Sequence, residues 1–395
     1  SMFNRVCVTL AIICGCTFTA AAAEPFRYQP GKFERGELRY VEDVPVLTVA
    51  GSPEEIGRQI GTLGAKQAPK LLDYPRACLR QVALEFAAPS FIAVGEKMVA
   101  RFPEDYRNEF DALIAAAGAK RSELVLGNTL YDLKKLFGCS TLCIEANRSA
   151  TGGTLFGRNL DFPTLGVLQD YTLVTVYRPT GKHAWASVGF PGMLGCLSGM
   201  NDAGLAVAVL EVYASADGAS HLNTEGLPYG LCHRKILEEC TTIEEALKLL
   251  RSLPRTTMIN LAVADPKTGA IFEITPKSVV KRPADGGLCA ATNHFRTPDL
   301  ATDTRCYRYE RLMRANRKAT IDSDTVWALM NSANQGDITL QTMIFEPADL
   351  RLRLSIGEAP TSARPGTLLD LKPYLTAKEP PVAGADAGRG EKAVR

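Results

Sequence analysis

The chain has 395 residues, of which 46% are hydrophobic and 22% are charged, a composition typical of globular proteins. This composition excludes wholesale disorder, a collagen and a coiled coil. The 45 Lys and Arg residues nearly balance the 43 Asp and Glu residues, and the resulting formal charge of +2 provides no basic field to attract a polyanion. We therefore expect no nucleic-acid partner.

Residues 1–23 have the pattern of a secretory signal peptide. Arg5 supplies a basic start, residues 6–19 are apolar or small, and three Ala residues precede Glu24 like a cleavage site. We expect a secreted or periplasmic protein, with a lipoprotein anchor at Cys16 as the alternative. The apolar run is shorter than the roughly 20 residues that span a bilayer, and no later run is longer. We therefore expect no transmembrane helix.

The cysteines and histidines give no sign of a metal site. Of the 11 Cys residues, three lie in the predicted signal peptide, and the remaining eight permit disulfides without revealing them. There are only four His residues and neither a CxxC nor an HExxH motif. Dinucleotide and P-loop motifs are also absent from the sequence. We expect no metal and no organic cofactor.

Residues 24–138 are predicted to be mainly helical. The pattern gives, in chain order, a turn-rich start over 24–45, a short strand over 46–49 and helical segments over 66–117 that break near Pro89 and Pro103. Between them a helix starts at Ser52, which serves as the N-cap, with Glu55 at the capping-box position. Gly57, Gly61 and Gly64 recur along this helix and predict the close approach of another backbone.

Strands dominate after Gly138. The predicted strands are 154–162, 171–178, 184–190, 194–200, 205–212, 258–265, 270–275, 287–292, 340–346 and 350–356, and the first five are expected to form one antiparallel sheet. The predicted helices are 228–239, 242–252 (opened by a capping box at Thr242), 303–318 and 324–333. Strand and helix runs without strict βαβ alternation indicate an α+β fold, with antiparallel sheets and helices on their outer faces.

These patterns divide the chain into four parts. They are the signal peptide (1–23), a mainly helical small segment (24–138), a large segment of strands and helices (139–374) and a tail (375–395). The tail is rich in Ala, Pro, Gly and Lys, and we expect it to be disordered.

The junction between Gly138 and Cys139 is the most informative point in the sequence. Gly138 has no Cβ, so its carbonyl carbon is open to attack by the side chain of the next residue. We predict that the Cys139 thiol attacks this carbonyl and that water resolves the thioester, which would leave Cys139 as an N-terminal residue. Its α-amine, of a kind whose pKa in free peptides is about 7.7 to 8, could then accept the thiol proton without any His.

Two charged residues follow on the next predicted strand. Arg158, if close to Cys139, would lower the pKa of its thiol, and Asp161 could hold the α-ammonium by a charge-assisted hydrogen bond. The alternative interpretation is a surface Arg–Asp ion pair at the end of a hairpin.

The stretch from Cys139 to Phe162 resembles the N-terminal nucleophile (Ntn) hydrolases of the choloylglycine hydrolase and acid ceramidase type. In that type a mature N-terminal Cys is followed by a G-R-N-x-D-[FW] strand, here residues 157–162. The closest likeness is to the penicillin acyltransferase-like family (acyl-coenzyme A:6-aminopenicillanic acid acyltransferase) of self-processing hydrolases and acyltransferases. Further blocks at 49–61, 199–206, 291–295, 308–312 and 342–357 also resemble that family.

The resemblance implies a four-layer αββα sandwich with a mainly helical N-terminal propeptide, made as an exported precursor. It also implies the roles of six site residues: Cys139 as nucleophile and, through its α-amine, base; Arg158 and Asp161 beside it; Asn201 as the side-chain donor of the oxyanion hole; Asn293 pointing at the nucleophile; and Arg308 as the last site residue, with Arg305 as its competitor.

We expect the mature protein to cleave a linear amide of a small N-acyl or peptide-like substrate through a Cys139 thioester, with its small and large fragments still associated. Transfer of the acyl group to an amine is the alternative. An unprocessed, inactive binding protein of the same fold is a hypothesis from another class. A third is a thiol protease, which would need His233 or His294 near Cys139.

The other cysteines have simpler interpretations. Cys143 lies four residues after Cys139 on the same strand face, and is either a core residue or a redox partner. Cys232 and Cys240 are eight residues apart on one helix face and are expected to pack in the core.

Overall fold

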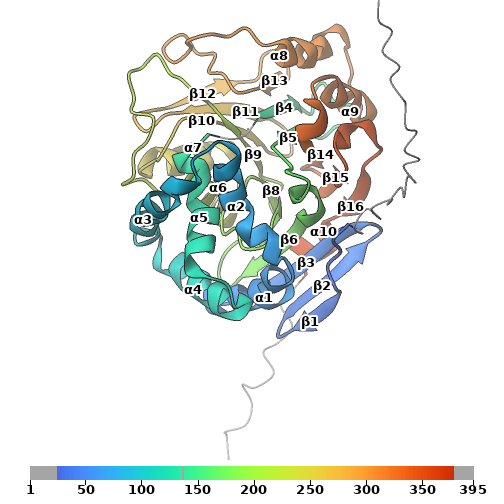
Figure 1. Cartoon of the computed structure of the whole chain (residues 1–395). Helices are drawn as coiled ribbons and strands as arrows, with labels where there is room; N and C mark the ends of the chain where they lie inside the picture. The colour runs from blue at the N-terminus through green and yellow to red at the C-terminus, as the bar shows by residue number, and fades with distance from the viewer. Residues whose placement is uncertain (1–24, 136–137, 378–395) are drawn as a thin grey trace, which may run out of the picture.

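The computed structural model describes residues 25–135 and 138–377. Two β-sheets pack face to face, and helices cover the outer face of each (Figure 1). In the described residues the larger sheet has the strand order β1-β2-β3-β6-β7-β8-β9-β10-β11-β12, and the smaller sheet has the order β13-β4-β5-β14-β15-β16. This is the predicted four-layer αββα sandwich. The expected signal peptide, and the expected tail beyond residue 377, lie outside the described residues.

The strands are β1 (Gly31–Phe33), β2 (Gly36–Val41), β3 (Val44–Gly51), β4 (Gly138–Ile144), β5 (Leu155–Asp161), β6 (Leu173–Pro179), β7 (Trp185–Gly189), β8 (Ser198–Asn201), β9 (Ala206–Glu211), β10 (Ile259–Ala264), β11 (Gly269–Ile274), β12 (Val279–Pro283), β13 (Leu288–Ala291), β14 (Thr339–Glu346), β15 (Arg351–Ser355) and β16 (Thr367–Asp370).

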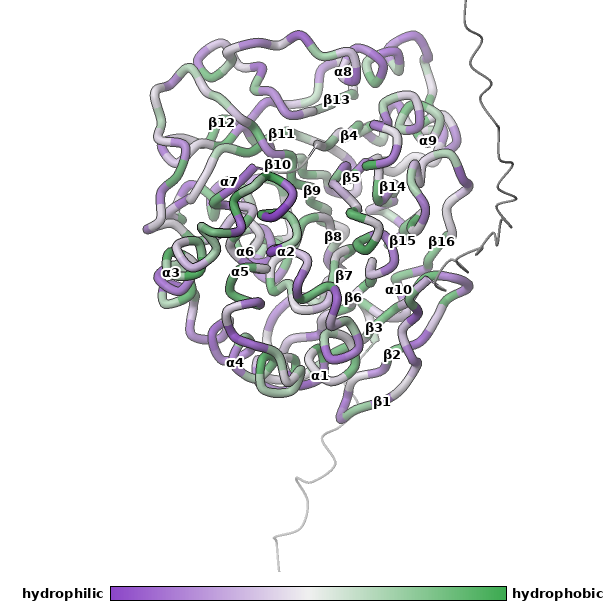
Figure 2. The backbone as a smooth tube through the Cα atoms, in the orientation of Figure 1, coloured by the Kyte–Doolittle hydropathy of each residue, from purple (hydrophilic) through white to green (hydrophobic). Residues whose placement is uncertain are grey.

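The α-helices are α1 (Pro53–Leu63), α2 (Pro69–Gln81), α3 (Ala88–Val99), α4 (Glu104–Ala117), α5 (Arg121–Leu133), α6 (Tyr229–Glu239), α7 (Ile243–Ser252), α8 (Tyr307–Leu312), α9 (Ser323–Ser332) and α10 (Lys372–Leu375). Helices α1, α6 and α7 pack on the larger sheet, and α8 and α9 pack on the smaller sheet. Apolar residues concentrate along the inner strands, while polar residues mark the outer loops (Figure 2).

The start of the small segment differs from its prediction. Residues 24–45 were expected to be turn-rich, but they contain β1 and β2, which form an antiparallel ribbon with β3. Strand β3 then pairs in parallel with β6 of the large segment. Pairing, rather than a strong local pattern, stabilises these polar strands. The small segment is therefore part of the larger sheet and does not form a layer of its own.

The expectation that the first five strands of the large segment form one sheet is wrong for the first of them. Strand β5 lies in the smaller sheet, between β4 and β14, whereas β6 to β9 are consecutive antiparallel neighbours in the larger sheet. The chain crosses between the sheets through residues 162–172. A short connection alone could not reveal this change of sheet.

Several other boundaries are corrected as well. The strand expected at 194–200 begins only at Ser198, and the helix expected at 303–318 is divided into α8 and a 3₁₀ turn at Met313–Arg317. Strands β12 and β16 and helices α5 and α10 had no counterpart among the predicted elements.

Helix α1 confirms both of its predicted features. The Ser52 side chain accepts a hydrogen bond from the Glu55 amide, and the Glu55 carboxylate accepts one from the Ser52 amide, which completes the capping box. A Cβ built on Gly57 would lie 2.2 Å from the Glu109 carbonyl oxygen of α4. The glycine therefore allows α1 and α4 to pack backbone against backbone.

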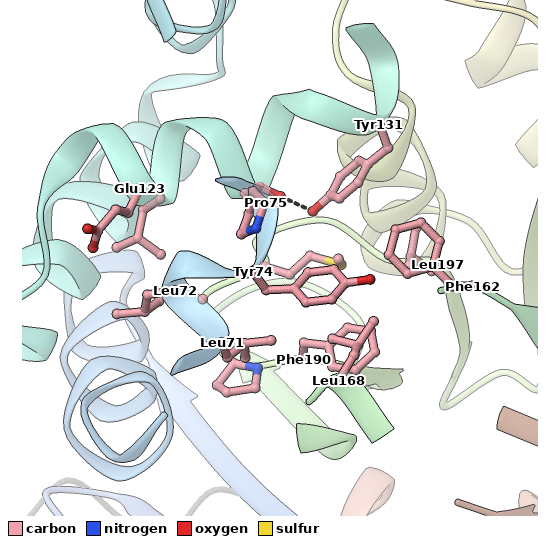
Figure 3. Close-up of a pocket in the computed structure, with 15 residues that line it drawn as sticks. Leu71, Leu72, Tyr74, Pro75, Glu123, Tyr131, Phe162, Leu168, Phe190 and Leu197 are labelled. Atoms are coloured by element: carbon pink, nitrogen blue, oxygen red, sulfur yellow. Dashed lines mark hydrogen bonds between the residues drawn. The ribbon is translucent and has the colours of Figure 1, made fainter. Parts of the chain in front are cut away.

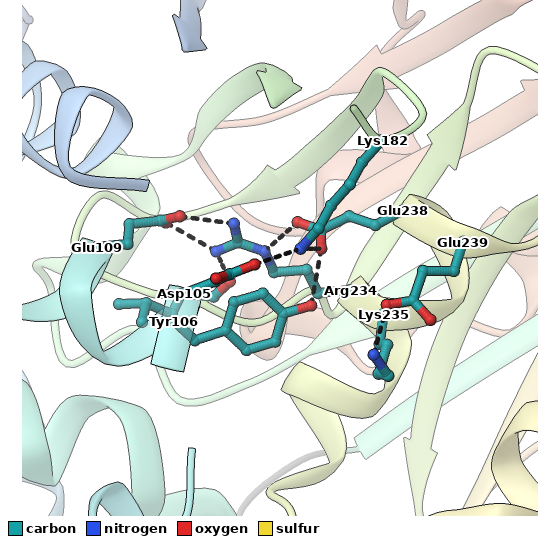
Figure 4. A network of polar contacts seen from close by, with 9 residues as sticks. Asp105, Tyr106, Glu109, Lys182, Arg234, Lys235, Glu238 and Glu239 are labelled. Atoms are coloured by element: carbon teal, nitrogen blue, oxygen red, sulfur yellow. Dashed lines mark hydrogen bonds and ion pairs between the residues drawn. The ribbon is translucent and has the colours of Figure 1, made fainter. Parts of the chain in front are cut away.

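A buried ionic network joins the two segments (Figure 4). Arg234 on α6 binds both carboxylate oxygens of Glu109 on α4, at 2.6 and 2.7 Å, and also donates to Glu238 at 2.7 Å. Tyr106 and Lys182 donate to the other oxygen of Glu238, at 2.8 and 2.9 Å. Because Arg234 and both carboxylates are buried, removal of one partner would leave an uncompensated charge in the core.

Within the described residues, no single helix is long and apolar enough to span a membrane. The segments Pro69–Gln81 and Glu85–Val99 meet the length and composition criteria together, but a bend of 120° separates them.

The contact between α1 and α4 generates a testable prediction. We expect Gly57→Ala to lower the free energy of unfolding by about 1–3 kcal/mol, because the new Cβ would overlap the Glu109 carbonyl. Gly127→Ala in α5 is the matched control, since its Cβ would meet only a Pro75 carbon at 3.8 Å. That variant should be neutral or more stable by about 0.5–1 kcal/mol. Urea unfolding measures both, and equal destabilisation of the two would contradict the packing argument.

Candidate active site

Cys139 is the second residue of β4, between strands β13 and β5, and its side chain is fully buried. Its backbone N–H donates to Asn293 Oδ1 at 3.0 Å, and its carbonyl oxygen accepts from Arg308 Nη1 at 2.5 Å. Both polar groups of its backbone are therefore bound to side chains that come from more than 150 residues further along the chain.

Asn293 and Arg308 also bind each other. Arg308 Nη2 donates to Asn293 Oδ1 at 2.9 Å, and Asn293 Nδ2 donates to the Glu211 carbonyl at 2.8 Å. Arg308 Nη1 lies 3.6 Å from the Asp161 carboxylate. Arg305, the competing candidate, has a side chain that is 91% exposed and pairs with Asp303, so it lies outside the site.

Asp161 ends strand β5 next to the predicted cleavage point. Its carboxylate accepts hydrogen bonds from Gln335 Nε2 and Thr339 Oγ1, both at 2.7 Å. Burial raises the pKa of Asp161, and these hydrogen bonds and Arg308 oppose that effect. Gly138 pairs with Asp161, and a Cβ on Gly138 would lie 2.2 Å from Gln335 Nε2. A larger residue before Cys139 would therefore have to displace Gln335, the partner of Asp161.

Arg158 is fully buried between the two sheets. Its Nε donates to Ser198 Oγ at 2.9 Å, while its two terminal nitrogens have no nitrogen or oxygen partner among the described residues. Burial raises the pKa of the Cys139 thiol, and the neighbouring Arg158 charge opposes this. The alternative interpretation of a surface ion pair is wrong, because Arg158 and Asp161 are both buried.

Asn201 does not join this cluster. Its Nδ2 donates to the carbonyls of Leu237 and Cys240 at the end of α6, and its Oδ1 accepts from the amides of Ala203 and Leu205. Both amide hydrogens are therefore engaged. The expectation that Asn201 offers a free donor to an oxyanion is corrected: it holds the β8–β9 turn against α6.

The structure adds Glu211, which sequence reasoning missed. This buried residue ends β9, and its carbonyl oxygen accepts the hydrogen bond from Asn293. The Glu211 charge raises the pKa of Cys139. Burial lowers the pKa of Lys135, and the Glu211 charge opposes that lowering. A carboxylate at the end of a fully apolar strand was the available sequence signal. The partners of Asp161 gave no such signal: Gln335 lies in the loop before β14, and Thr339 is the first residue of that strand.

The histidines do not support a Cys–His protease. His233 is buried, its Nδ1 lies 3.1 Å from the Cys196 carbonyl, and burial lowers its pKa to about 4. Burial also lowers the pKa of His294. In the part of the chain that the structure describes, no hydrogen bond joins either ring to Cys139.

An apolar cavity lies between the small and large segments (Figure 3), and none of the site residues named above lines it. Phe162, the residue after Asp161, lines it, and so does Tyr131, which packs against Tyr229. The remaining wall is mainly aliphatic and aromatic, formed by Leu71, Leu72, Tyr74, Pro75, Leu124, Leu168, Phe190, Pro191, Met193 and Leu197.

The two asparagines generate opposite predictions. Asn201→Ala should cost about 1–3 kcal/mol of stability, since it leaves buried carbonyls at the end of α6 without a donor, but the folded variant should still be cleaved before Cys139. Asn293→Ala should slow that cleavage about 100-fold, because the Cys139 amide loses its acceptor. Urea unfolding and the time course on denaturing gels measure the two effects. Slow cleavage in a stable Asn201→Ala variant would show that Asn201 takes part in the cleavage reaction.

Comparisons with known proteins agree with the expected family. The family described as acyl-coenzyme A:6-aminopenicillanic acid acyl-transferase matches residues 148–359. Protein dcd1B of Dictyostelium discoideum is 24% identical over 261 residues, covering 59% of this chain and 50% of that protein. An uncharacterized protein of Archaeoglobus fulgidus is 20% identical over 342 residues, covering 71% and 56%. The chain thus spans about half the length of these curated relatives.

Among solved structures, a mutant of the conjugated bile acid hydrolase from Clostridium perfringens is similar with a TM-score of 0.43 and 14% identity. The match covers 59% of this chain and 92% of that one. The family match extends over more than half of the chain and includes Arg158, Asp161, Asn293 and Arg308. The chain therefore belongs to the acyl-coenzyme A:6-aminopenicillanic acid acyl-transferase family.

Proposed function

We propose that this protein is an exported, self-processing cysteine amidohydrolase that is cleaved between Gly138 and Cys139 and then hydrolyses N-acyl amides. The observation that carries the proposal is the environment of Cys139. Asn293 and Arg308 bind its backbone, and Arg158 lies beside its thiol. The family to which the chain belongs supports amide hydrolysis or acyl transfer as the reaction class.

The self-cleavage begins at the Gly138 carbonyl. The thiolate of Cys139 attacks the carbonyl carbon and a C–S bond forms, while the C–N bond to Cys139 breaks and the nitrogen takes up a proton. Water then hydrolyses the thioester, which leaves a carboxylate on Gly138 and a free α-amine and thiol on Cys139. The absence of a Cβ at Gly138 and its place opposite Asp161 support this point of attack.

In the mature protein the α-amine of Cys139 acts as the base. Asn293 Oδ1 already accepts a hydrogen bond from this nitrogen. The Asp161 carboxylate lies 3.6 Å from Arg308 Nη1, so the two opposite charges interact next to Cys139. The amine accepts the thiol proton, the thiolate attacks the substrate carbonyl, and the resulting ammonium protonates the leaving amine. Arg158 stabilises the thiolate by its charge.

The two fragments are expected to remain together after cleavage. Strand β3 of the small fragment pairs with β6 of the large fragment, and the buried Arg234–Glu109 ion pair crosses the same boundary. Leaving either carboxylate or guanidinium unpaired in the core would cost about 3–5 kcal/mol. Association of the fragments is therefore a property of the sheet and core, not of the peptide bond that is cut.

The apolar cavity supports a substrate with an apolar acyl group. Its wall is contributed by both segments, and it begins at Phe162, next to Asp161. Its volume is about 70 Å³ in the intact chain, smaller than the roughly 150 Å³ of a cavity that holds benzene. Short aliphatic or aryl acyl groups that displace the half-buried Leu72 and Met193 fit this site best.

Cleavage is tested with Cys139→Ala. We expect wild-type protein to yield a large fragment that begins Cys-Ser-Thr-Leu, whereas Cys139→Ala stays uncut because alanine has no nucleophile. Denaturing gels, intact mass and N-terminal sequencing give the answer. Cys232→Ala is the matched control, since it removes another buried thiol, and it should be cut normally. Wild-type protein that stays intact for days at neutral pH would instead favour an inactive binding protein.

The reaction class is tested with N-acetyl, N-hexanoyl and N-phenylacetyl derivatives of one amine. We expect kcat/KM to be at least roughly tenfold higher for the two larger acyl groups, because they bury more apolar surface. Met193→Gln should reduce this preference, and Met313→Gln, which changes a half-buried Met near α8, should not.

Mass spectrometry of the products formed with added hydroxylamine tests which nucleophile accepts the acyl group. Hydroxamate reports the acyl thioester in either class of enzyme, because hydroxylamine attacks any thioester. In a parallel reaction with an ordinary primary amine, free acid as the main product fits a hydrolase, whereas mainly the new amide would assign an acyltransferase.

A further inference from the structure

Two cysteines face each other across strands β4 and β13. Cys143 is opposite Cys289 in the antiparallel register, and both side chains are buried between the two sheets. Directly opposed residues of antiparallel strands have Cα atoms about 4.5–5.5 Å apart, which lies within the roughly 4.4–6.8 Å that disulfides span. The backbone therefore already has the spacing that a bond between these two sulfurs requires.

The sulfur atoms also converge on one point of the facing sheet. A Cβ built on Gly269 of β11 would lie 2.2 Å from Cys143 Sγ and 3.3 Å from Cys289 Sγ. Both sulfurs therefore occupy the space that the missing side chain leaves. The Cys289 thiol and burial raise the pKa of Cys143, which agrees with direct contact between the thiols.

This pair differs from the other cysteines. Among the register pairs of the described strands, Cys143 and Cys289 are the only two cysteines that are opposed to each other. Both thiols are free in this structure, but the cysteine that the register places next to Cys143 is Cys289 on the neighbouring strand, and not Cys139 on its own strand.

We propose that Cys143 and Cys289 form an intramolecular disulfide that ties β4 to β13. Formation of the S–S bond releases two protons and two electrons. The electrons reduce a disulfide of an oxidising thiol couple, such as oxidised glutathione, to two thiols. Since both sulfurs are buried, the bond forms during folding, and reductants do not reach it in the folded protein.

The position of this bond gives it a consequence for the site. Continued by two residues beyond Ala291 and Thr141, the register of β4 and β13 places Asn293 opposite Cys139, where the Cys139 amide binds the Asn293 side chain. The disulfide lies on the same pair of strands and fixes that register covalently. If the proposed cleavage occurs, Cys139 becomes a chain end, and chain ends tend to fray. A covalent tie four residues away would keep it opposite Asn293.

The test uses full-length protein made in an oxidising compartment, in both the wild-type and the Cys139→Ala form. The samples are denatured with N-ethylmaleimide but without reductant, digested with trypsin and analysed by mass spectrometry. We expect residues 139–148 of the cleaved wild-type protein, and residues 136–148 of the uncut Cys139→Ala protein, to be linked to residues 282–296. Unlinked labelled forms of these peptides should be less than about one-tenth of the total. In Cys139→Ala the first peptide has Cys143 as its only thiol, so the assignment is unambiguous and does not depend on cleavage.

The controls follow from the same geometry. Cys232 and Cys240 should carry the label without reduction, and Cys289→Ala should release Cys143 to be labelled. The double variant Cys143→Ala/Cys289→Ala should melt roughly 5 °C or more below the oxidised wild-type protein, because its unfolded state lacks a long closed loop. Label on both Cys143 and Cys289 in the oxidised sample, or a link from Cys143 to any other cysteine, would overturn the proposal.

Discussion

The hydrogen bond from the Cys139 amide to Asn293 is the contact on which the candidate site depends. It exists because β4 and β13 pair in one register, and a shift by one residue would turn Cys139 away from the space between the sheets. Arg308 then binds both partners, through the Cys139 carbonyl and the Asn293 side chain. Two residues distant in sequence, Asn293 and Arg308, thus fix the backbone of the proposed nucleophile from both sides.

This arrangement requires several charges to be buried, which is unfavourable unless each is compensated. Asp161 has Gln335, Thr339 and Arg308 as partners. Arg158 uses one nitrogen on Ser198 and leaves two without nitrogen or oxygen partners among the described residues. A buried charge with unused hydrogen-bond donors, such as the Arg158 guanidinium, is typical of functional sites, where it stabilises an opposite charge that forms during the reaction. The Cys139 thiol lies beside Arg158, and the thiolate that the proposed mechanism forms from it would carry such a charge.

The sequence pattern alone pointed to the site residues of two neighbouring strands, and the family resemblance added Asn293 and Arg308, which the structure places at Cys139. Other contacts between distant segments were not predicted. Cys139, Arg158 and Asp161 lie on paired strands joined by a short connection, so their spacing in sequence reflects their spacing in the sheet. Asn201 looked equally suitable, but the end of α6, which the sequence could not place, engages its amide. Glu211 was missed because its place at the end of an apolar strand does not reveal the contact with Asn293, which depends on tertiary structure. Strands β1 and β2 likewise depend on pairing within a sheet whose other strands come later in the chain.

The same long-range pairing explains how one peptide bond could be cut without loss of the fold. The small segment supplies β1, β2 and β3 to the larger sheet, α1 and α4 to its outer layer, and Glu109 to the buried ion pair with Arg234. None of these contacts involves the bond between Gly138 and Cys139. On the other side of that bond, β4 pairs with β5 over its whole length and with β13 from Thr141 to Ile144, and the Asn293 side chain just beyond β13 binds the Cys139 amide. Cleavage would therefore free an amine at a place where the neighbouring strands already hold it, which is what a nucleophile with its own base needs.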